Sequence, residues 1–116
     1  MWFFRSPSIV YGEDSLSFLN DIPQRNILII TDKNIVNAGL LKKVEKELPE
    51  DSKMNVIDTV PVEPTISYIR SLKSEVESFT PNLIIGLGGG SCMDCAKVTF
   101  VSYERPDIDL YEITPL

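Results

Sequence analysis

Hydrophobic and polar positions alternate along this chain in two different periods. Continuous runs of β-branched and apolar residues are typical of strands that are covered on both faces. Strands are predicted at 8–11, 26–31, 56–60 and 83–85. Apolar residues spaced three and four apart predict amphipathic helices between them. Helices are predicted at 13–19, 33–48, 66–79 and 91–103. Strands alternating with helices predict right-handed crossovers and a parallel α/β sheet.

A doubly wound, Rossmann-like sheet binds ligands beyond the carboxyl ends of its strands. The segments to search are therefore 31–32, 60–65 and 86–91. Such a sheet normally has more strands than this chain predicts, and the helix at 91–103 is apolar nearly all round. We therefore expect residues 1–116 to form the front part of a larger fold.

Composition and charge exclude several classes of protein. The 116 residues are 43% hydrophobic and 24% charged, as in an ordinary globular domain, and the net charge is −6. A negative surface repels phosphate backbones and anionic headgroups, so we expect no nucleic-acid partner and no membrane partner. The sequence has no histidine, the commonest general base and metal ligand. No signal segment is recognisable, which favours a cytoplasmic location.

Four of the six glycines lie within five positions, between a predicted strand and a predicted helix. They are Gly86, Gly88, Gly89 and Gly90. Glycines let a ligand approach the backbone, and the helix that follows offers free N–H groups to a phosphate. The segment is thus a candidate pyrophosphate cradle. The alternative is a plain strand-to-helix turn, in which Ser91 caps the helix and Asp94 completes a capping box; Ser91 could hold both roles.

Two common phosphate-binding motifs do not fit this segment. A P-loop ends in Gly-Lys-Ser/Thr, and Lys97 comes too late for that. The Rossmann fingerprint would have Ser91 in place of its third glycine, and Asp107 or Asp109 as its acidic partner, neither of which ends an apolar strand. The segment therefore represents a different type of phosphate loop.

The segment 86–97, GLGGGSCMDCAK, resembles the G-x-G-G-G-S-x-x-D-x-A-K signature of the iron-containing alcohol dehydrogenase family, and all eight specified positions match. The resemblance also includes Pro7, Ile9, the Tyr11-Gly12 pair, Ser15-Leu16 and Leu19, the ITD sequence that ends in Asp32, and the VEPT segment 62–65. It covers essentially the whole chain, but only the N-terminal part of the family's cofactor-binding domain.

The resemblance implies an NAD(P)-dependent oxidoreductase that interconverts an alcohol and an aldehyde or ketone by hydride transfer. In that family the Gly-Gly-Gly-Ser loop binds the cofactor pyrophosphate, and this loop corresponds here to Gly88, Gly89, Gly90 and Ser91. We expect Asp94 to organise the loop and to reach the cofactor. A divalent iron or zinc, held by an Asp and several His of a helical C-terminal domain, polarises the substrate oxygen. This chain lacks those ligands, so we assign it no catalytic or metal-binding residue and expect no turnover by residues 1–116 alone.

Asp32 follows the predicted strand at 26–31, where its carboxylate could accept both hydroxyls of the adenosine ribose. The same charge would repel a 2′-phosphate, which favours NAD over NADP. The alternative is an ordinary Asp that caps the next helix. Val62 and Glu63 depart from the family, which usually has Pro and Asn there, and an ionised Glu63 cannot donate a hydrogen bond.

Two rival functions remain open. Cys92 and Cys95 form a C-x-x-C pair at a predicted helix start, as in thiol/disulfide redox proteins, although the glycines before them have no use in that chemistry. The chain could also be a nucleotide-binding remnant without catalysis. Because the second domain is missing, apolar surface should remain uncovered, so we expect a homo-oligomer, most simply a dimer.

Overall fold

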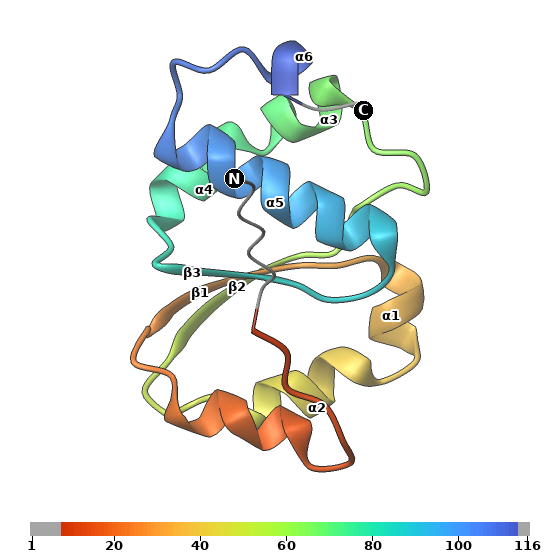
Figure 1. The fold of residues 1–116 in the computed structure, drawn as a ribbon, viewed down its shortest axis with the longest axis vertical. Helices are drawn as coiled ribbons and strands as arrows, with labels where there is room; N and C mark the ends of the chain where they lie inside the picture. The colour runs from red at the N-terminus through yellow and green to blue at the C-terminus, as the bar shows by residue number, and fades with distance from the viewer. Residues whose placement is uncertain (1–7, 114–116) are drawn as a thin grey trace, which may run out of the picture.

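The computed structural model describes residues 8–113, which form a layered α/β structure around one small sheet (Figure 1). The sheet contains three parallel strands in the order β2-β1-β3. The strands are β1 Asn26–Ile30, β2 Lys53–Ile57 and β3 Leu83–Gly86. The helices are the 3-10 helix η1 Ser15–Asp21, α1 Lys33–Asn37, α2 Leu40–Glu47, α3 Ile66–Ser71, α4 Lys73–Phe79, α5 Gly90–Glu104 and α6 Leu110–Ile113. The predicted parallel α/β fold is confirmed.

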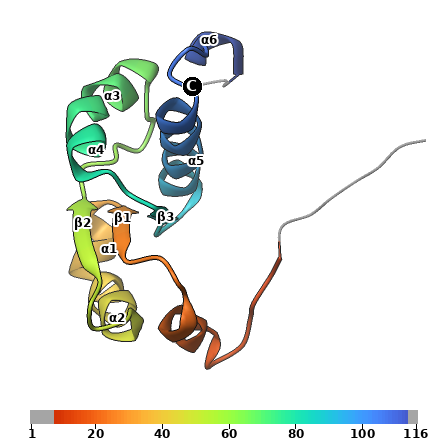
Figure 2. The same cartoon turned by 90° about the vertical axis from the view of Figure 1, so that its left-hand side faces the viewer.

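The central strand β1 separates two hydrophobic layers. All four side chains from Ile27 to Ile30 are fully buried. Successive side chains of a strand point to opposite faces. Leu28 and Ile30 therefore pack with α3, α4 and α5, whereas Ile27 and Ile29 pack on the side of η1 and α2. Figures 1 and 2 show these helices on the two faces of the sheet. The alternation explains why an unbroken apolar run was needed here.

The N-terminal predictions are only partly correct. Residues 8–11 form no strand, and the side chains of Ile9 and Tyr11 are 75% and 87% exposed. The β-branched residues of this segment have no neighbouring strand edge to pair with, and strand propensity alone does not form a ladder. The helix predicted at 13–19 is instead the 3-10 helix η1, in which Leu19 packs against the core while Leu16 stays partly exposed.

Each of the two long helices predicted at 33–48 and 66–79 is broken into two. Gly39 has a φ of +84°, a left-handed conformation that ends α1 and starts α2. Leu72 separates α3 from α4. The strand predicted at 56–60 lies three residues earlier, at Lys53–Ile57, because the chain then crosses the end of β1: Asp32 and Thr59 form an isolated antiparallel bridge.

The third strand and the helix that follows it agree with the predictions. The strand predicted at 83–85 is β3 Leu83–Gly86, and the helix predicted at 91–103 is α5, which runs for 15 residues from Gly90 to Glu104. The buried side of α5 carries small and β-branched residues: Cys92, Cys95, Ala96, Val98 and Thr99. The predicted apolar character of its other side is also correct, since Met93 and Phe100 are 46% and 52% exposed.

Candidate functional site

The three segments predicted from the strand ends meet in one pocket. The pocket has a volume of about 180 Å3 and lies where β1, β2 and β3 finish. Its walls come from the start of α1, the loop after β2 and the start of α5: Asp32, Asn34, Val60, Pro61, Val62, Gly89, Gly90, Ser91 and Cys92. The position at the carboxyl edge of the sheet agrees with the rule for open α/β sheets.

The side chain and backbone of Thr31 connect the three strand ends. Thr31 is fully buried, and its Oγ1 donates a hydrogen bond of 2.8 Å to the carbonyl oxygen of Leu87. Its backbone N–H donates to the oxygen of Ile57 at 2.8 Å, and its oxygen accepts from the N–H of Val60 at 3.2 Å. Thr31 thereby fixes the glycine loop and the loop after β2 to the end of β1. No local pattern predicts this role, because the partners of Thr31 lie 26 to 56 residues away in the chain.

Two glycines of the loop are required by the protein's own packing. A Cβ on Gly86 would lie 2.8 Å from the Cβ of Ala96, so α5 can approach β3 only because residue 86 has no side chain. Gly88 has a φ of +139°, and a Cβ there would lie 2.9 Å from the Sγ of Cys92. The small size of Ala96 serves the same close approach. These two positions therefore have a structural explanation without any ligand.

The other two glycines, Gly89 and Gly90, have no such explanation. Neither has a positive φ, and a Cβ at either position would meet nothing within 4 Å. Both line the pocket. Ala would be accommodated at either position, and at Gly90, inside α5, it would be the better helix former. The protein alone thus leaves the absence of side chains at 89 and 90 unexplained, and space kept for a ligand explains it.

Free amide groups point out of the start of α5. Within residues 8–113 the N–H groups of Gly90, Ser91 and Cys92 have no hydrogen-bond acceptor, and the first backbone bond of the helix is from Met93 to Gly89. The unpaired N–H groups of a helix start, together with the positive end of its dipole, favour an anion. Because no Lys or Arg of the described residues lines this pocket, these amides are the source of positive potential that this part of the chain provides.

Ser91 connects the start of α5 to the loop after β2. Its Oγ donates a hydrogen bond of 2.6 Å to the carbonyl oxygen of Val62. The capping-box interpretation is wrong, because the residue that caps α5 is Gly89 and no side chain makes a capping hydrogen bond. Ser91 lies inside the first turn, so its hydroxyl is directed to the neighbouring loop instead. The Asp94 side chain is exposed, makes no hydrogen bond with any of residues 8–113 and does not line the pocket. Its predicted role therefore stays a prediction.

Asp32 caps α1 and lines the pocket at the same time. It is the N-cap residue, and its Oδ1 accepts a hydrogen bond of 2.9 Å from the N–H of Ile35. The capping alternative for Asp32 is therefore confirmed. An ionised carboxylate has about four acceptor positions, so the cap leaves capacity for a ligand. The nearby cation Lys33 is paired with Asp58 at 3.4 Å, and the negative charge of Asp32 remains at the pocket wall.

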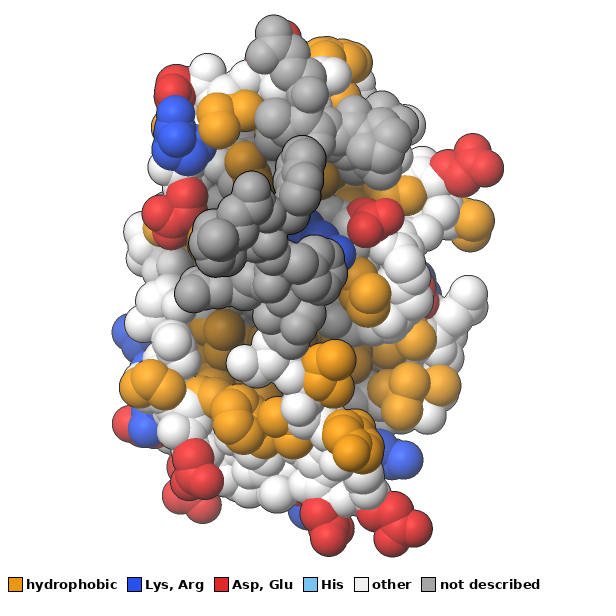
Figure 3. Space-filling view, in the orientation of Figure 1, with side chains coloured by type: hydrophobic (Ala, Val, Ile, Leu, Met, Phe, Trp, Pro, Cys, Tyr) orange, Lys and Arg blue, Asp and Glu red, His pale blue; other side chains and the backbone are white. Residues whose placement is uncertain are grey.

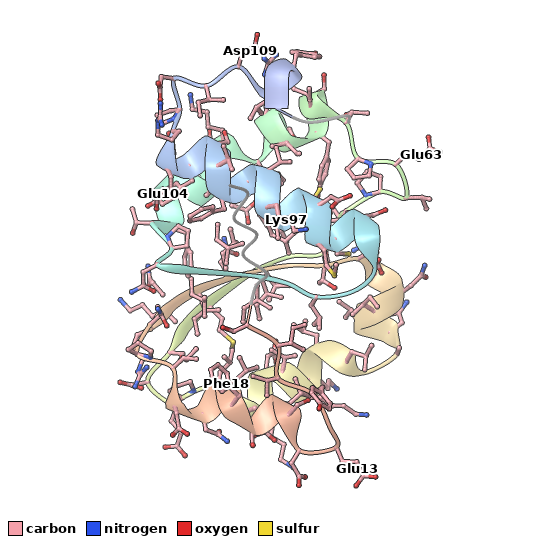
Figure 4. The ribbon with its side chains drawn as sticks, in the orientation of Figure 1. Glu13, Phe18, Glu63, Lys97, Glu104 and Asp109 are labelled. Carbon is pink, nitrogen blue, oxygen red and sulfur yellow. The ribbon has the colours of Figure 1, made fainter. Side chains whose placement is uncertain are left out.

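The loop after β2 contributes backbone and apolar side chains. Pro61 and Val62 line the pocket, whereas Glu63 does not. Glu63 is exposed on the outside of this loop (Figure 4). The departure from the family at Glu63 therefore places no carboxylate in the pocket wall.

The two cysteines are buried thiols. Cys92 and Cys95 are 1% and 0% exposed, and both are free. Burial, the hydrogen bond to Asp32 and the charge of Asp32 raise the pKa of Cys92 to about 11. Burial, with a smaller contribution from the charge of Asp94, raises the pKa of Cys95 to about 11. Dithiol redox enzymes need an accessible thiol with a lowered pKa, so the structure argues against the redox alternative.

These thiols should make the fold less stable in alkali. A thiol whose pKa rises from 9.0 to about 11 on folding contributes stability below about pH 9, and this contribution disappears as the pH rises through about 11. Below about pH 9 each protonated thiol thus contributes about 2–3 kcal/mol to the free energy of unfolding. Urea unfolding at about pH 8 and about pH 10.5 should show this fall. In a variant with Cys92→Ala and Cys95→Ala the fall should be smaller by several kcal/mol; an equal fall would show that other groups cause it.

A second cavity of about 530 Å3 lies between β3 and the exposed side of α5. Its walls include Ile84, Met93 and Phe100, and Lys97 and Glu104 border it (Figure 4). Further apolar side chains gather on the lower half of the face in Figure 3. Leu16 and Phe18 of η1 are 42% and 60% exposed. Apolar surfaces of this kind pack against polypeptide. They are candidate surfaces for the self-association expected from the sequence, which stays a prediction.

Residues 8–113 contain no group of three or more His, Cys, Asp or Glu side chains that could hold a metal ion. No helix in this range is long and apolar enough to cross a membrane.

Comparison with known proteins gives consistent matches. The family model for iron-containing alcohol dehydrogenase matches residues 6–115. An alcohol dehydrogenase of Thermococcus barophilus is 33% identical over 108 residues, which cover 90% of this chain and 29% of that protein. The bifunctional aldehyde-alcohol dehydrogenase AdhE of Escherichia coli K12 is 32% identical over 118 residues, which cover 97% of this chain and 13% of AdhE.

Solved structures show the same relationship. The iron-containing alcohol dehydrogenase of Thermococcus thioreducens superposes with a TM-score of 0.86 at 29% identity, covering 93% of this chain and 29% of that chain. Another iron-containing alcohol dehydrogenase has a TM-score of 0.74 at 23% identity, which shows the shared fold. The chain spans between 13% and 34% of the length of these relatives, so its fold is one part of theirs, a partial domain.

Proposed function

The chain belongs to the iron-containing alcohol dehydrogenase family, and from that premise we propose that it forms part of the NAD site of an enzyme of this family. The reaction is the interconversion of an alcohol and an aldehyde or ketone by hydride transfer. One observation carries the proposal: Gly89 and Gly90 leave open space in front of free amide groups, at the pocket where the strands end. When bound, NAD supplies the nicotinamide ring that accepts or gives the hydride.

In this proposal the start of α5 holds the cofactor's pyrophosphate. The N–H groups of Gly90, Ser91 and Cys92 donate to phosphate oxygens, and the helix dipole adds to the attraction. Gly89 and Gly90 allow the phosphates to approach the backbone closely. Ser91 keeps the loop at Val62 in position through its 2.6 Å hydrogen bond. The net charge is −6 and no Lys or Arg among residues 8–113 lines the pocket, so the backbone amides are the proposed main anchor for this anion.

We assign recognition of the adenosine ribose to Asp32. Its carboxylate lines the pocket together with Gly89 and Gly90 and retains acceptor positions beyond the cap of α1. Two neighbouring ribose hydroxyls can donate to such a carboxylate, whereas a 2′-phosphate would meet an unscreened negative charge. NAD is therefore the proposed cofactor in preference to NADP.

The variant Asp32→Asn tests this assignment, because asparagine keeps the capping oxygen and removes the charge. We expect NAD to bind about tenfold more weakly, since hydrogen bonds to a charged group contribute about 1.5–3 kcal/mol. NADP should bind to the variant at least as well as to the wild type, so the preference for NAD over NADP should decrease. Calorimetric titration with both dinucleotides measures this. Equal affinity of the wild type for NAD and NADP would contradict the role of Asp32.

The metal of the family has no site within the described residues. Iron or zinc needs several carboxylate, imidazole or thiolate ligands, and residues 8–113 gather no such group, while the sequence has no histidine. The two buried thiols are protonated at neutral pH and belong to the core. We therefore assign metal binding and activation of the substrate oxygen to other parts of the longer enzymes of this family, and derive no step through the metal here.

Binding and turnover can be tested separately on this chain. Calorimetric titration of residues 1–116 should show one NAD per chain, while an assay with NAD and simple primary alcohols should show no NADH formation. The non-catalytic alternative makes the same prediction for the isolated chain, so the chain should also be joined to the C-terminal remainder of the Thermococcus barophilus relative. Alcohol-dependent NADH formation by that fusion supports the enzyme. Absence of NAD binding by residues 1–116 would contradict the proposed function.

A further inference from the structure

A contact between two residues 60 positions apart connects the glycine loop to the ribose side of the pocket. The Sγ of Cys92 lies 3.4 Å from the Oδ2 of Asp32. Because an ionised carboxylate only accepts, the thiol is the donor. The other carboxylate oxygen, Oδ1, accepts from the N–H of Ile35 at 2.9 Å. Both oxygens of Asp32 therefore have a fixed protein partner, one from each neighbouring helix.

We propose that Cys92 is a positioning residue for dinucleotide selection, whose thiol fixes the Asp32 carboxylate in the orientation that accepts the adenosine ribose hydroxyls. This inference rests on the proposed function. A single hydrogen bond from Ile35 to Oδ1 tolerates some rotation of the whole carboxylate about the Cβ–Cγ bond, which moves both oxygens. With Oδ2 also bound, the orientation of the carboxylate is set before a ligand arrives, and its remaining acceptor positions are available to the pocket.

The Cys92 thiol is buried next to Gly88 and Asp32. Cys92 is 1% exposed, and its Sγ occupies the space that a Cβ on Gly88 would enter, at 2.9 Å. Gly88 thus gives the thiol room beside Asp32. Within residues 8–113 no Lys or Arg forms an ion pair with Asp32, since the adjacent Lys33 is paired with Asp58. The thiol is therefore the side chain that holds Oδ2.

The thiol remains a donor under physiological conditions. Burial raises the pKa of Cys92, with further contributions from the hydrogen bond and the charge of Asp32, to about 11. A group with that pKa keeps its proton at neutral pH, so the hydrogen bond to Asp32 persists. The same property makes Cys92 a poor nucleophile, which suits a positioning role and not a redox role.

The test compares three variants of residues 1–116 by calorimetric titration with NAD and with NADP. Cys92→Ala removes the donor and should weaken NAD binding about fivefold, the value of one hydrogen bond, with a smaller effect on NADP. Cys92→Ser restores a donor and should recover most of the NAD affinity. Cys95→Ala is the matched control: it removes an equally buried thiol from the same helix that has no contact with Asp32. It should change neither affinity.

A second measurement examines the contact without any ligand. Asp32→Asn removes the negative charge that accepts the hydrogen bond of the thiol and that would repel a thiolate. The pKa of Cys92, measured from the pH dependence of alkylation, should therefore fall below the wild-type value. An unchanged pKa would overturn the inference. The inference would also be overturned if the wild type binds NAD and the variants Cys92→Ala and Cys95→Ala show the same ratio of NAD affinity to NADP affinity. If the wild type bound neither dinucleotide, the proposed function would fail instead, whatever the thiol titration showed.

Discussion

Alanine at Gly90 is expected to stabilise the fold while weakening NAD binding. Gly90 is the first residue of α5, its φ is not positive, and an added Cβ meets nothing within 4 Å. Alanine is a better helix former than glycine by about 0.5–1 kcal/mol, so the free energy of unfolding should rise by up to this amount. The added methyl group would stand where the pyrophosphate approaches the backbone.

The effect on binding should be largest in the double variant Gly89→Ala, Gly90→Ala. Displacing the phosphates from the free amides removes charge-assisted hydrogen bonds of about 1.5–3 kcal/mol each, so NAD should bind at least about thirtyfold more weakly. Urea unfolding and calorimetric titration measure the two quantities on the same samples. Wild-type NAD affinity in this variant would show that the open space at Gly89 and Gly90 does not serve the cofactor.

Substitution of Gly86 is expected to give the largest loss of stability. A Cβ there would lie 2.8 Å from the Cβ of Ala96 and 3.1–3.2 Å from backbone atoms of Cys92 and Met93. These atoms belong to α5, so the helix would have to move away from β3. Overpacking of this kind costs about 1–3 kcal/mol, and Gly86→Ala should lower the free energy of unfolding by about the upper value. Chemical denaturation measures it.

A compensating change identifies the cause of this loss. Ala96→Gly removes the atom that lies closest to the new Cβ, so the double variant Gly86→Ala, Ala96→Gly should lose less stability than the sum of the two single variants. The helix would still lose about 1 kcal/mol through the new glycine. Strictly additive losses would show that contact with Ala96 is not what makes glycine necessary at position 86.

The parts of the fold that depend on local sequence were predictable. The unbroken apolar run of β1 indicated a strand buried on both faces, and Ile27 to Ile30 are indeed fully buried. The glycine cluster indicated a strand-to-helix connection, which lies between β3 and α5. These signals work because burial and backbone freedom are properties of residues close together in the chain.

The missed features depend on tertiary contacts. The apolar residues of 33–48 keep helical spacing across Gly39, so the pattern does not show the break there, although α2 buries Val44 and α1 buries no residue. The end of β2 is set by pairing with β1 and by the turn that brings Val60 to Thr31, not by the apolar residues up to position 60. In the pocket, the bonds from Ser91 to Val62 and from Cys92 to Asp32 span 29 and 60 residues, for which no local pattern exists.

The central claim is that the first amides of α5 bind the pyrophosphate of NAD. The most direct measurement is a titration of the isotopically labelled chain with NAD, followed through the backbone amide resonances. The account predicts that the amide protons of Gly90, Ser91 and Cys92 move furthest, in the direction of stronger hydrogen bonding, and saturate together at one NAD per chain. Saturable binding that leaves these three resonances unmoved while others shift would contradict it.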